Sequence, residues 1–255
     1  MAVLTPKNKI KMEKMMHLAA QYLAAAGISF VEKKADDSHT NLGWSIDKQR
    51  LETHSLSTDG DVLALNYNTF SLEWDSPKNK ASFALDGKTH QQVLEWLTNS
   101  ADSFLGKTYT YDFHYDLPYS IDDSFTFVLD GSKLKELADL RTLTQSSLEK
   151  TLAVNGLESD IRIWPHHFDS GAYVVISDDL SIGFGLAVPD TMVTEHYFYI
   201  SGYKGHSGLD TSKFDSLSLG EWKNEGFKGA VLPATKINEE QVVQFFTEAI
   251  NTYKK

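Results

Sequence analysis

The sequence predicts an α+β fold in which antiparallel meander sheets are flanked by helices. Four stretches carry apolar residues at steps of three and four positions, which is the period of an amphipathic helix. Between them lie short extended runs rich in Leu, Tyr, Phe and Val, separated by turn residues such as Asp-Gly. Because these strands follow one another through short turns, we expect them to pair antiparallel.

The first half predicts a helix, a meander and a second helix. The first helix covers residues 7–26 and is expected to end at Gly27. Extended segments follow at 28–32, 42–46 and 61–74. After the turn Leu85-Asp86-Gly87, an apolar stripe that includes Val93, Trp96 and Leu97 predicts a second helix, which ends at Gly106.

The second half predicts the same order of elements. Residues 109–115 alternate strictly between aromatic and polar side chains, and this alternation predicts the clearest strand of the chain. A helix is expected at 132–154 and a last helix at 238–253. Between them we expect strands at 160–164, 172–177, 181–188, 195–201 and 228–232, with a loop rich in Gly, Ser and Asp at 203–226.

The repeated order of elements indicates an internal duplication of a helix–sheet–helix unit. Residues 93–98 and 242–247 match in residue character, and each follows a strand and a turn. The alternative is that any two amphipathic helices look alike. We predict a division into 1–107 and 108–255, or one continuous domain.

Composition excludes several classes of function. The chain has 24 Lys and Arg against 35 Asp and Glu, a net charge of −11, which argues against binding to nucleic acid or to anionic membranes. It has no Cys, so disulfides, thiolate metal sites and Cys nucleophiles are ruled out. Lysines interrupt the N-terminal segment, and no apolar run is long enough to cross a bilayer. We therefore expect a cytoplasmic protein.

One segment of the second half concentrates chemically active side chains. The string Trp164-Pro165-His166-His167-Phe168-Asp169 places two imidazoles and a carboxylate between large rings, directly after a predicted strand. Pro165 cannot donate to a strand ladder, so it marks an edge, a bulge or the end of that strand. If the backbone bends there, the polar groups that follow can gather in one recess.

This string resembles the Trp-Pro-Glu-His-Phe-Asp signature of an uncharacterised bacterial protein family. The resemblance covers residues 161–200, where His166 replaces the usual Glu and His196 replaces a usual Pro. It implies a shared fold for this part of the chain. It implies no activity, because none is attached to the family.

Three hypotheses follow for this segment. The first is a pocket with an aromatic rim that binds a small polar ligand or a partner, formed by Trp164, His166, His167, Asp169, Glu195 and Tyr197, without a cofactor. The second is a metal-dependent hydrolase or isomerase, in which His167 and Asp169 hold a divalent ion such as Zn²⁺ and Glu195 is the general base. The third is a packing corner without chemistry, as in a structural or interaction protein.

Overall fold

The computed structural model describes residues 6–117 and 119–255, and it confirms the predicted α+β fold. Within these residues the chain forms four α-helices and two antiparallel sheets. It divides into two compact units. The first comprises the chain up to Thr142 together with Ile163–His166, and the second comprises Leu143–Arg162 and His167–Lys255. The division into 1–107 and 108–255 was predicted from the repeated order of elements in the sequence, and it stays a prediction.

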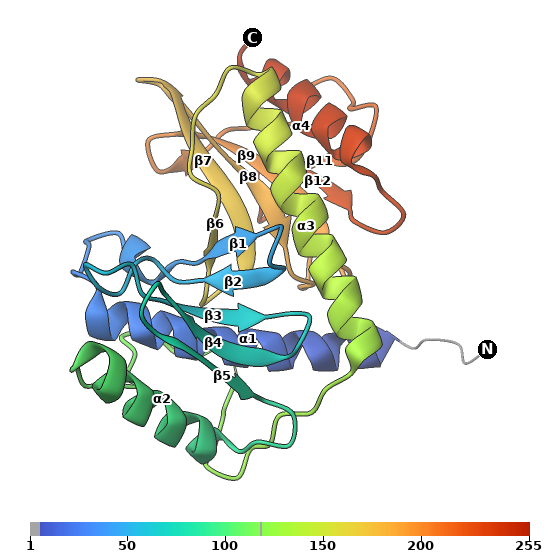
Figure 1. Cartoon of the computed structure of the whole chain (residues 1–255). Coiled ribbons are helices and arrows are strands. Elements are labelled where there is room, and N and C mark those ends of the chain that lie inside the picture. The colour runs from blue at the N-terminus through green and yellow to red at the C-terminus, as the bar shows by residue number, and fades with distance from the viewer. Residues whose placement is uncertain (1–5, 118) are drawn as a thin grey trace. The chain divides into compact units, whose positions relative to one another are not determined.

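The first unit contains a helix, a five-stranded meander and a second helix (Figure 1). Its strands pair antiparallel in chain order, from β1 to β5. The elements are α1 (Pro6–Phe30), the short 3-10 helix η1 (Ser38–Thr40), β1 (Gly43–Ser45), β2 (Arg50–Glu52), β3 (Val62–Asn66), β4 (Ser71–Asp75), β5 (Lys80–Ala84), α2 (His90–Leu105) and the beginning of α3 (Gly131–Val154).

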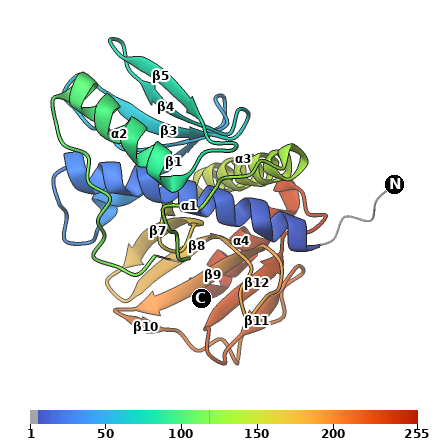
Figure 2. The same ribbon diagram turned by 90° about the horizontal axis from the view of Figure 1, so that it is seen from below.

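The two faces of this sheet differ because side chains alternate along each strand. One face is apolar and carries buried residues such as Leu63 and Trp74. The indole Nε1 of Trp74 donates to Ser100 Oγ of α2 at 2.8 Å, and α1 packs beside β3. The opposite face is polar, and Arg50 lies on it among carboxylates. Figure 2 shows α1 and α2 beside the strands of this unit.

Helix α1 is longer than predicted, because Gly27 does not end it. The helix continues to Phe30, so the strand predicted at 28–32 is wrong. A Cβ at Gly27 would lie 2.7 Å from the carbonyl oxygen of His39, so glycine is required here by the close approach of η1. A glycine that permits backbone packing looks the same in sequence as a glycine that stops a helix.

The strand predicted at 109–115 is wrong as well. The segment has no ladder partner among the described residues, although its side chains alternate between shielded and exposed as predicted. Its shielded rings lie against α1: Tyr109 Oη donates to the carbonyl of Tyr22 at 3.1 Å, and Tyr115 Oη donates to Gln21 Oε1 at 3.0 Å. A period of two therefore reports an extended chain buried on one side, with or without a neighbouring strand.

An isolated antiparallel bridge, between Thr89 and Thr126, lies outside the named strands of the first unit. The second unit follows the prediction more closely. Strands β7, β8, β9 and β12 lie within or near the predicted ranges, while β10 and β11 fall in the segment predicted as loop. The elements of this unit are β7 (Asp169–Ser177), β8 (Leu180–Ala187), β9 (Tyr197–Lys204), β10 (Ser207–Gly208), β11 (Glu221–Lys223), β12 (Gly229–Pro233) and α4 (Glu239–Tyr253). The division between the units falls within β6 (Arg162–Trp164), after Arg162.

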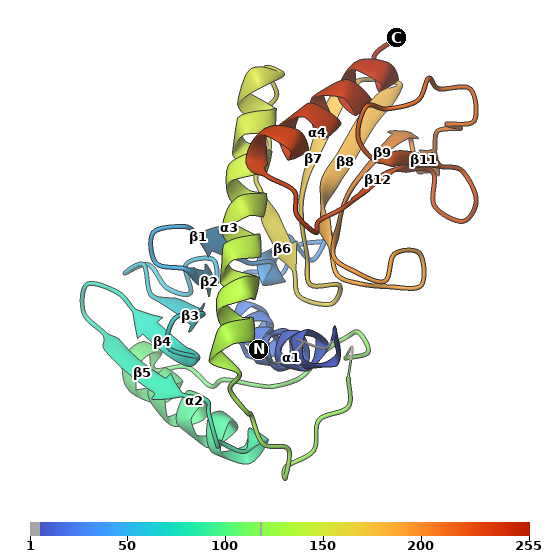
Figure 3. The same ribbon diagram turned by 90° about the vertical axis from the view of Figure 1, so that its right-hand side faces the viewer.

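The second sheet has the order β11-β12-β9-β8-β7-β6, with β10 paired to β9. Helix α4 covers one face of this sheet, as Figure 3 shows. The ring of Phe246 lies 5.1 Å from that of Phe184 and 5.9 Å from that of Phe198, and these rings form the core beneath the helix. The end of α3 joins this layer, since Asn155 Nδ2 donates to Thr247 Oγ1 at 3.0 Å.

The two units share an order of elements, while the duplication itself stays a prediction. In the first, β2-β3-β4-β5 form a meander that leads into α2; in the second, β7-β8-β9-β12 form a meander that leads into α4. Residues 205–228 are inserted between the third and fourth of these strands in the second unit. Both closing helices begin with a capping box, Thr89 with Gln92 and Asn238 with Gln241.

Candidate functional site

The predicted segment forms a turn. Trp164 ends β6, residues 165–168 turn, and Asp169 begins β7. Phe168 has a φ of 62°, in the left-handed region, which reverses the chain in a short space. The division between the two units falls inside this turn: Trp164 and His166 belong to the first, and His167 and Asp169 belong to the second.

In the first unit, the turn is held by its backbone. The carbonyl oxygen of Pro165 accepts hydrogen bonds from His17 Nε2 at 2.6 Å and from Gln21 Nε2 at 2.8 Å, and both donors lie on α1. The His166 ring lies 6.0 Å from the Trp164 ring and 5.6 Å from the Tyr115 ring. Contacts of this kind at Pro165, Trp164 and His166 are consistent with the packing-corner hypothesis, which stays a prediction.

In the second unit, the side chain of His167 is exposed, whereas that of Asp169 is half-buried. Tyr199 Oη donates to Asp169 Oδ2 at 2.9 Å across the sheet, and the Oδ1 atom is buried with no partner among the described residues. Burial raises the pKa of Tyr199, and the adjacent Asp169 carboxylate raises it further. Tyr199 therefore remains protonated and serves as a fixed hydrogen-bond donor.

Glu195 and Tyr197 each have a partner of their own. Glu195 accepts a hydrogen bond from Thr235 Oγ1, and Tyr197 Oη donates to Asp190 Oδ2 at 2.7 Å. Burial and the Asp190 carboxylate raise the pKa of Tyr197. Tyr197 and Tyr199 share one face of β9, because they are two residues apart on a strand. Of the predicted set, the structure thus places Asp169 and Tyr197 near the same tyrosine-rich face.

The described residues form no cluster of metal ligands. Within residues 6–117 and 119–255, no group of three or more His, Asp or Glu side chains converges to hold an ion. His167 and Asp169 as ligands of one divalent ion stay a prediction. We derive no reaction step from them.

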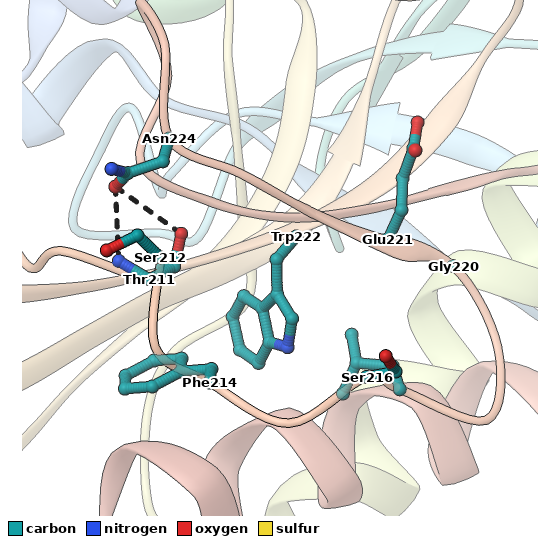
Figure 4. Close-up of a pocket in the computed structure, with 9 residues that line it drawn as sticks. Thr211, Ser212, Phe214, Ser216, Gly220, Glu221, Trp222 and Asn224 are labelled. Carbon is teal, nitrogen blue, oxygen red and sulfur yellow. Dashed lines mark hydrogen bonds between the residues drawn. The ribbon is translucent and has the colours of Figure 1, made fainter.

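A pocket in the second unit lies elsewhere, in the segment predicted as loop. It has a volume of about 360 Å³, within the range of small-molecule sites. Figure 4 shows the side chains around it, which come from the loop before β11, from β11 itself and from Asn224 directly after it. The lining residues are Thr211, Ser212, Phe214, Ser216, Leu217, Gly220, Glu221, Trp222 and Asn224.

Hydrogen bonds fix the shape of this loop. Thr211 is buried; its backbone N–H donates to Asn224 Oδ1 at 3.1 Å and its Oγ1 donates to the carbonyl of Lys223 at 2.8 Å. The indole Nε1 of Trp222 donates to the carbonyl of Asp215 at 3.0 Å. These hydrogen bonds connect residues 211–215 to residues 222–224 on both sides of the pocket. The walls of the pocket are therefore preformed.

Three rings support the pocket from the side of α4. The Trp222 ring lies 4.9 Å from Phe214 and 5.4 Å from Tyr253, and Phe214 lies 5.4 Å from Tyr253. All three pairs are close to perpendicular, which is a favourable arrangement for aromatic rings. Trp222 and Phe214 are half-buried, so part of each ring remains available at the pocket.

Sequence reasoning missed these residues because Gly, Ser and Asp dominate the stretch around them. The available signal was the pair Phe214 and Trp222 inside a polar loop, since large rings in loops are placed for packing or for binding. The alternating spacing around Trp222 that marks β11 covers three residues only, too few to predict a strand.

Comparison of the chain with protein-family models, with curated proteins and with solved structures finds no match. The resemblance of residues 161–200 to the bacterial family therefore stays a prediction. In the part of the chain that the structure describes, no helix has the length and apolar character that crossing a membrane requires.

Proposed function

We propose that this protein binds a small polar ligand in the pocket that Trp222 and Phe214 flank. The observation that carries the proposal is a preformed cavity of about 360 Å³ in which half-buried rings stand beside hydroxyl and amide groups. Rings of this kind cover the apolar face of a ligand, and a few fixed polar groups orient it.

The charge of the lining narrows the class of ligand. Of the nine residues that line the pocket, one is acidic, Glu221, and none is Lys or Arg. Lys223, next in the chain to Trp222, pairs with Glu221 at 2.7 Å, so an anionic ligand would lose its hydration without gaining an unpaired cation. We therefore expect a neutral or cationic ligand with hydroxyl or amine groups and one apolar face.

The proposed site is of the predicted kind, a pocket with an aromatic rim for a small polar ligand, but it consists of other residues. The second unit holds a pocket with an aromatic rim, but the predicted Trp164 and His166 belong to the first unit. Asp169 and Tyr197 are committed to Tyr199 and Asp190. The pocket of Figure 4 is the better candidate, because its polar groups line a cavity of about 360 Å³.

Ligand-observed NMR with a defined panel tests the proposal. The panel contains monosaccharides, polyols, nucleosides, amino-acid amides and quaternary ammonium ions, with sugar phosphates and dicarboxylates as anionic counterparts. We expect saturation transfer to at least one neutral or cationic class and none to its anionic counterpart. Absence of transfer to every class, or preference for the anions, would contradict the proposal.

Two variants locate the site. Ser216→Phe adds a bulky side chain at an exposed position of the lining and keeps the three rings themselves, and Trp222→Leu removes the ring beside the pocket. Both should abolish transfer to the panel member that binds. Trp96→Leu removes a half-buried tryptophan from the first unit and should leave transfer unchanged. Transfer that survives Ser216→Phe places binding outside this pocket.

A further inference from the structure

Strand β5 is one of the two edge strands of the first sheet. It pairs with β4 along one side only, and no described residue pairs with its other side. Lys80, Ser82 and Ala84 are exposed. An edge of five residues offers a row of unpaired backbone groups to another strand.

The backbone groups that point outward can be assigned from the ladder. Leu85 N–H donates to the carbonyl of Phe70 at 2.9 Å, and Ser76 N–H donates to the carbonyl of Asn79 at 3.0 Å. In an antiparallel pair, hydrogen-bonded residues alternate along the strand, so Ala81 and Phe83 also face β4. The N–H and C=O groups of Lys80, Ser82 and Ala84 therefore face away from the sheet.

We propose that β5 pairs with β5 of a second copy of this chain, antiparallel and centred on Ser82. This register places Ser82 opposite Ser82, Lys80 opposite Ala84, and Ala81 opposite Phe83. All three outward residues of each copy then form hydrogen-bonded pairs. The two five-stranded sheets become one continuous sheet across the dimer.

Charge and size both fit this register. The single charged side chain of β5, Lys80, lies opposite Ala84, so no like charges meet. Phe83 lies opposite the small Ala81. Phe83 is half-buried and stacks on half-buried Trp96 of α2, with ring centroids 5.2 Å apart and an interplanar angle of 24°. In the dimer, the Phe83–Trp96 stacks of the two copies would form one apolar surface along the new strand pair.

The edge of the other sheet shows the contrast. Strand β11 has three residues, and its Glu221 and Lys223 form an ion pair at 2.7 Å. Short, charged edges of this kind discourage pairing with another chain. Strand β5 is longer and has one charge, at its first residue. The chemistry of the two edges therefore favours a partner on β5.

Sedimentation equilibrium over a concentration series tests the proposal on the full chain. We expect a monomer–dimer equilibrium in the wild type. Ala84→Glu sets a carboxylate opposite Lys80 twice per dimer and should tighten the dissociation constant about threefold to tenfold. Ala84→Lys sets like charges there and should weaken it by a similar factor. A shift in the same direction for both variants would overturn the register.

Ser82→Pro tests the backbone pairing. Its N–H faces away from β4, so proline removes the central pair of intermolecular bonds and leaves the ladder with β4 intact. We expect a monomer with an unchanged circular dichroism spectrum. Thr98→Lys adds a charge on the exposed side of α2 and should leave the equilibrium unchanged. A monomeric wild type at every concentration, or a dimer that Ser82→Pro leaves intact, would overturn the proposal.

Discussion

Arg50 shows how a single residue organises the polar face of the first sheet. Its side chain is 6% exposed, and its guanidinium contacts Glu52 at 2.6 Å, Glu73 at 3.2 Å and Asp75 at 2.6 Å. The guanidinium, with Lys48 beside it, lowers the pKa of Asp75 to about 2. A buried cation requires such partners, because the loss of one carboxylate leaves its charge less well compensated.

Asp75→Asn should therefore destabilise the protein in a pH-dependent way. A lowered carboxyl pKa adds stability above the unfolded value of 3.8, and this stability is lost as the pH falls to about 2. We expect a loss of roughly 2 kcal/mol at pH 7 that shrinks towards zero at pH 2, measured by urea unfolding.

Asp59→Asn is the matched control for this measurement. Asp59 pairs with Lys78 at 2.7 Å, but both side chains are more than half exposed. Such a pair contributes at most about 1 kcal/mol. A loss for Asp75→Asn that equals the control, or one that does not depend on pH, would contradict the assigned role of Arg50.

Two glycines of β8 should differ sharply in their tolerance of alanine. A Cβ at Gly185 would lie 1.9 Å from the carbonyl oxygen of Ser170, whereas a Cβ at Gly183 would have its nearest neighbour, a Tyr203 ring atom, at 3.6 Å. We expect Gly185→Ala to cost more than about 4 kcal/mol or to prevent folding, and Gly183→Ala to cost less than about 1 kcal/mol. Thermal unfolding of both variants decides this, and equal midpoints would show that the sheet adapts at Gly185.

Individual residues also show what the sequence could not reveal. The string of rings, imidazoles and a carboxylate at 164–169 predicted a site beside Trp164, but a side chain in a sequence does not indicate whether its neighbours will be solvent, ligand or core. Asp169 pairs with Tyr199, 30 positions away. Such a partner is fixed by the register of β7, β8 and β9, and register depends on the packing of the whole sheet.

At the scale of elements, the closing helices α2 and α4 have matching N-termini. The side chains of Thr89 and Asn238 each accept a hydrogen bond from the backbone of the glutamine three residues later, and each glutamine bonds back. This arrangement satisfies two N–H groups that the helix leaves unpaired.

Removal of either cap should therefore have a similar cost. Thr89→Ala and Asn238→Ala should each destabilise the protein by about 1 kcal/mol. Thr98→Ala, on the exposed side of α2, should have almost no effect or stabilise slightly. Urea unfolding of the three variants checks this, and a Thr89→Ala midpoint that equals the Thr98→Ala midpoint would show that the first cap adds nothing.

Helices could be predicted from sequence because their period is local. Helices α2, α3 and α4 lie within a few residues of the predictions, since apolar steps and caps are present in the segment itself. Strands are less visible: residues 109–115 alternate without a ladder, and β2 and β5 were missed. A strand needs a partner, and a single segment does not specify one.

At the scale of the whole molecule, the pH dependence of stability should reflect buried histidine. His90, the first residue of α2, is buried, and Tyr22 Oη lies 2.7 Å from its Nδ1. Burial lowers the pKa of His90 below 6.5, although Asp123 and Asp122 oppose this shift. Burial also lowers the pKa of His39. Tyr22 itself has a raised pKa because it is buried, so it stays protonated beside His90.

A histidine with a lowered folded pKa stabilises the neutral form, so its contribution is complete above the unfolded value of 6.5 and declines as the pH falls below it. The urea midpoint of the wild type should therefore be constant above about pH 7 and decrease between about pH 6.5 and 5. His90→Gln should reduce this slope, and adding His39→Gln should reduce it further. A wild-type midpoint that stays constant down to pH 5 would show that protonation of His90 and His39 costs the fold nothing.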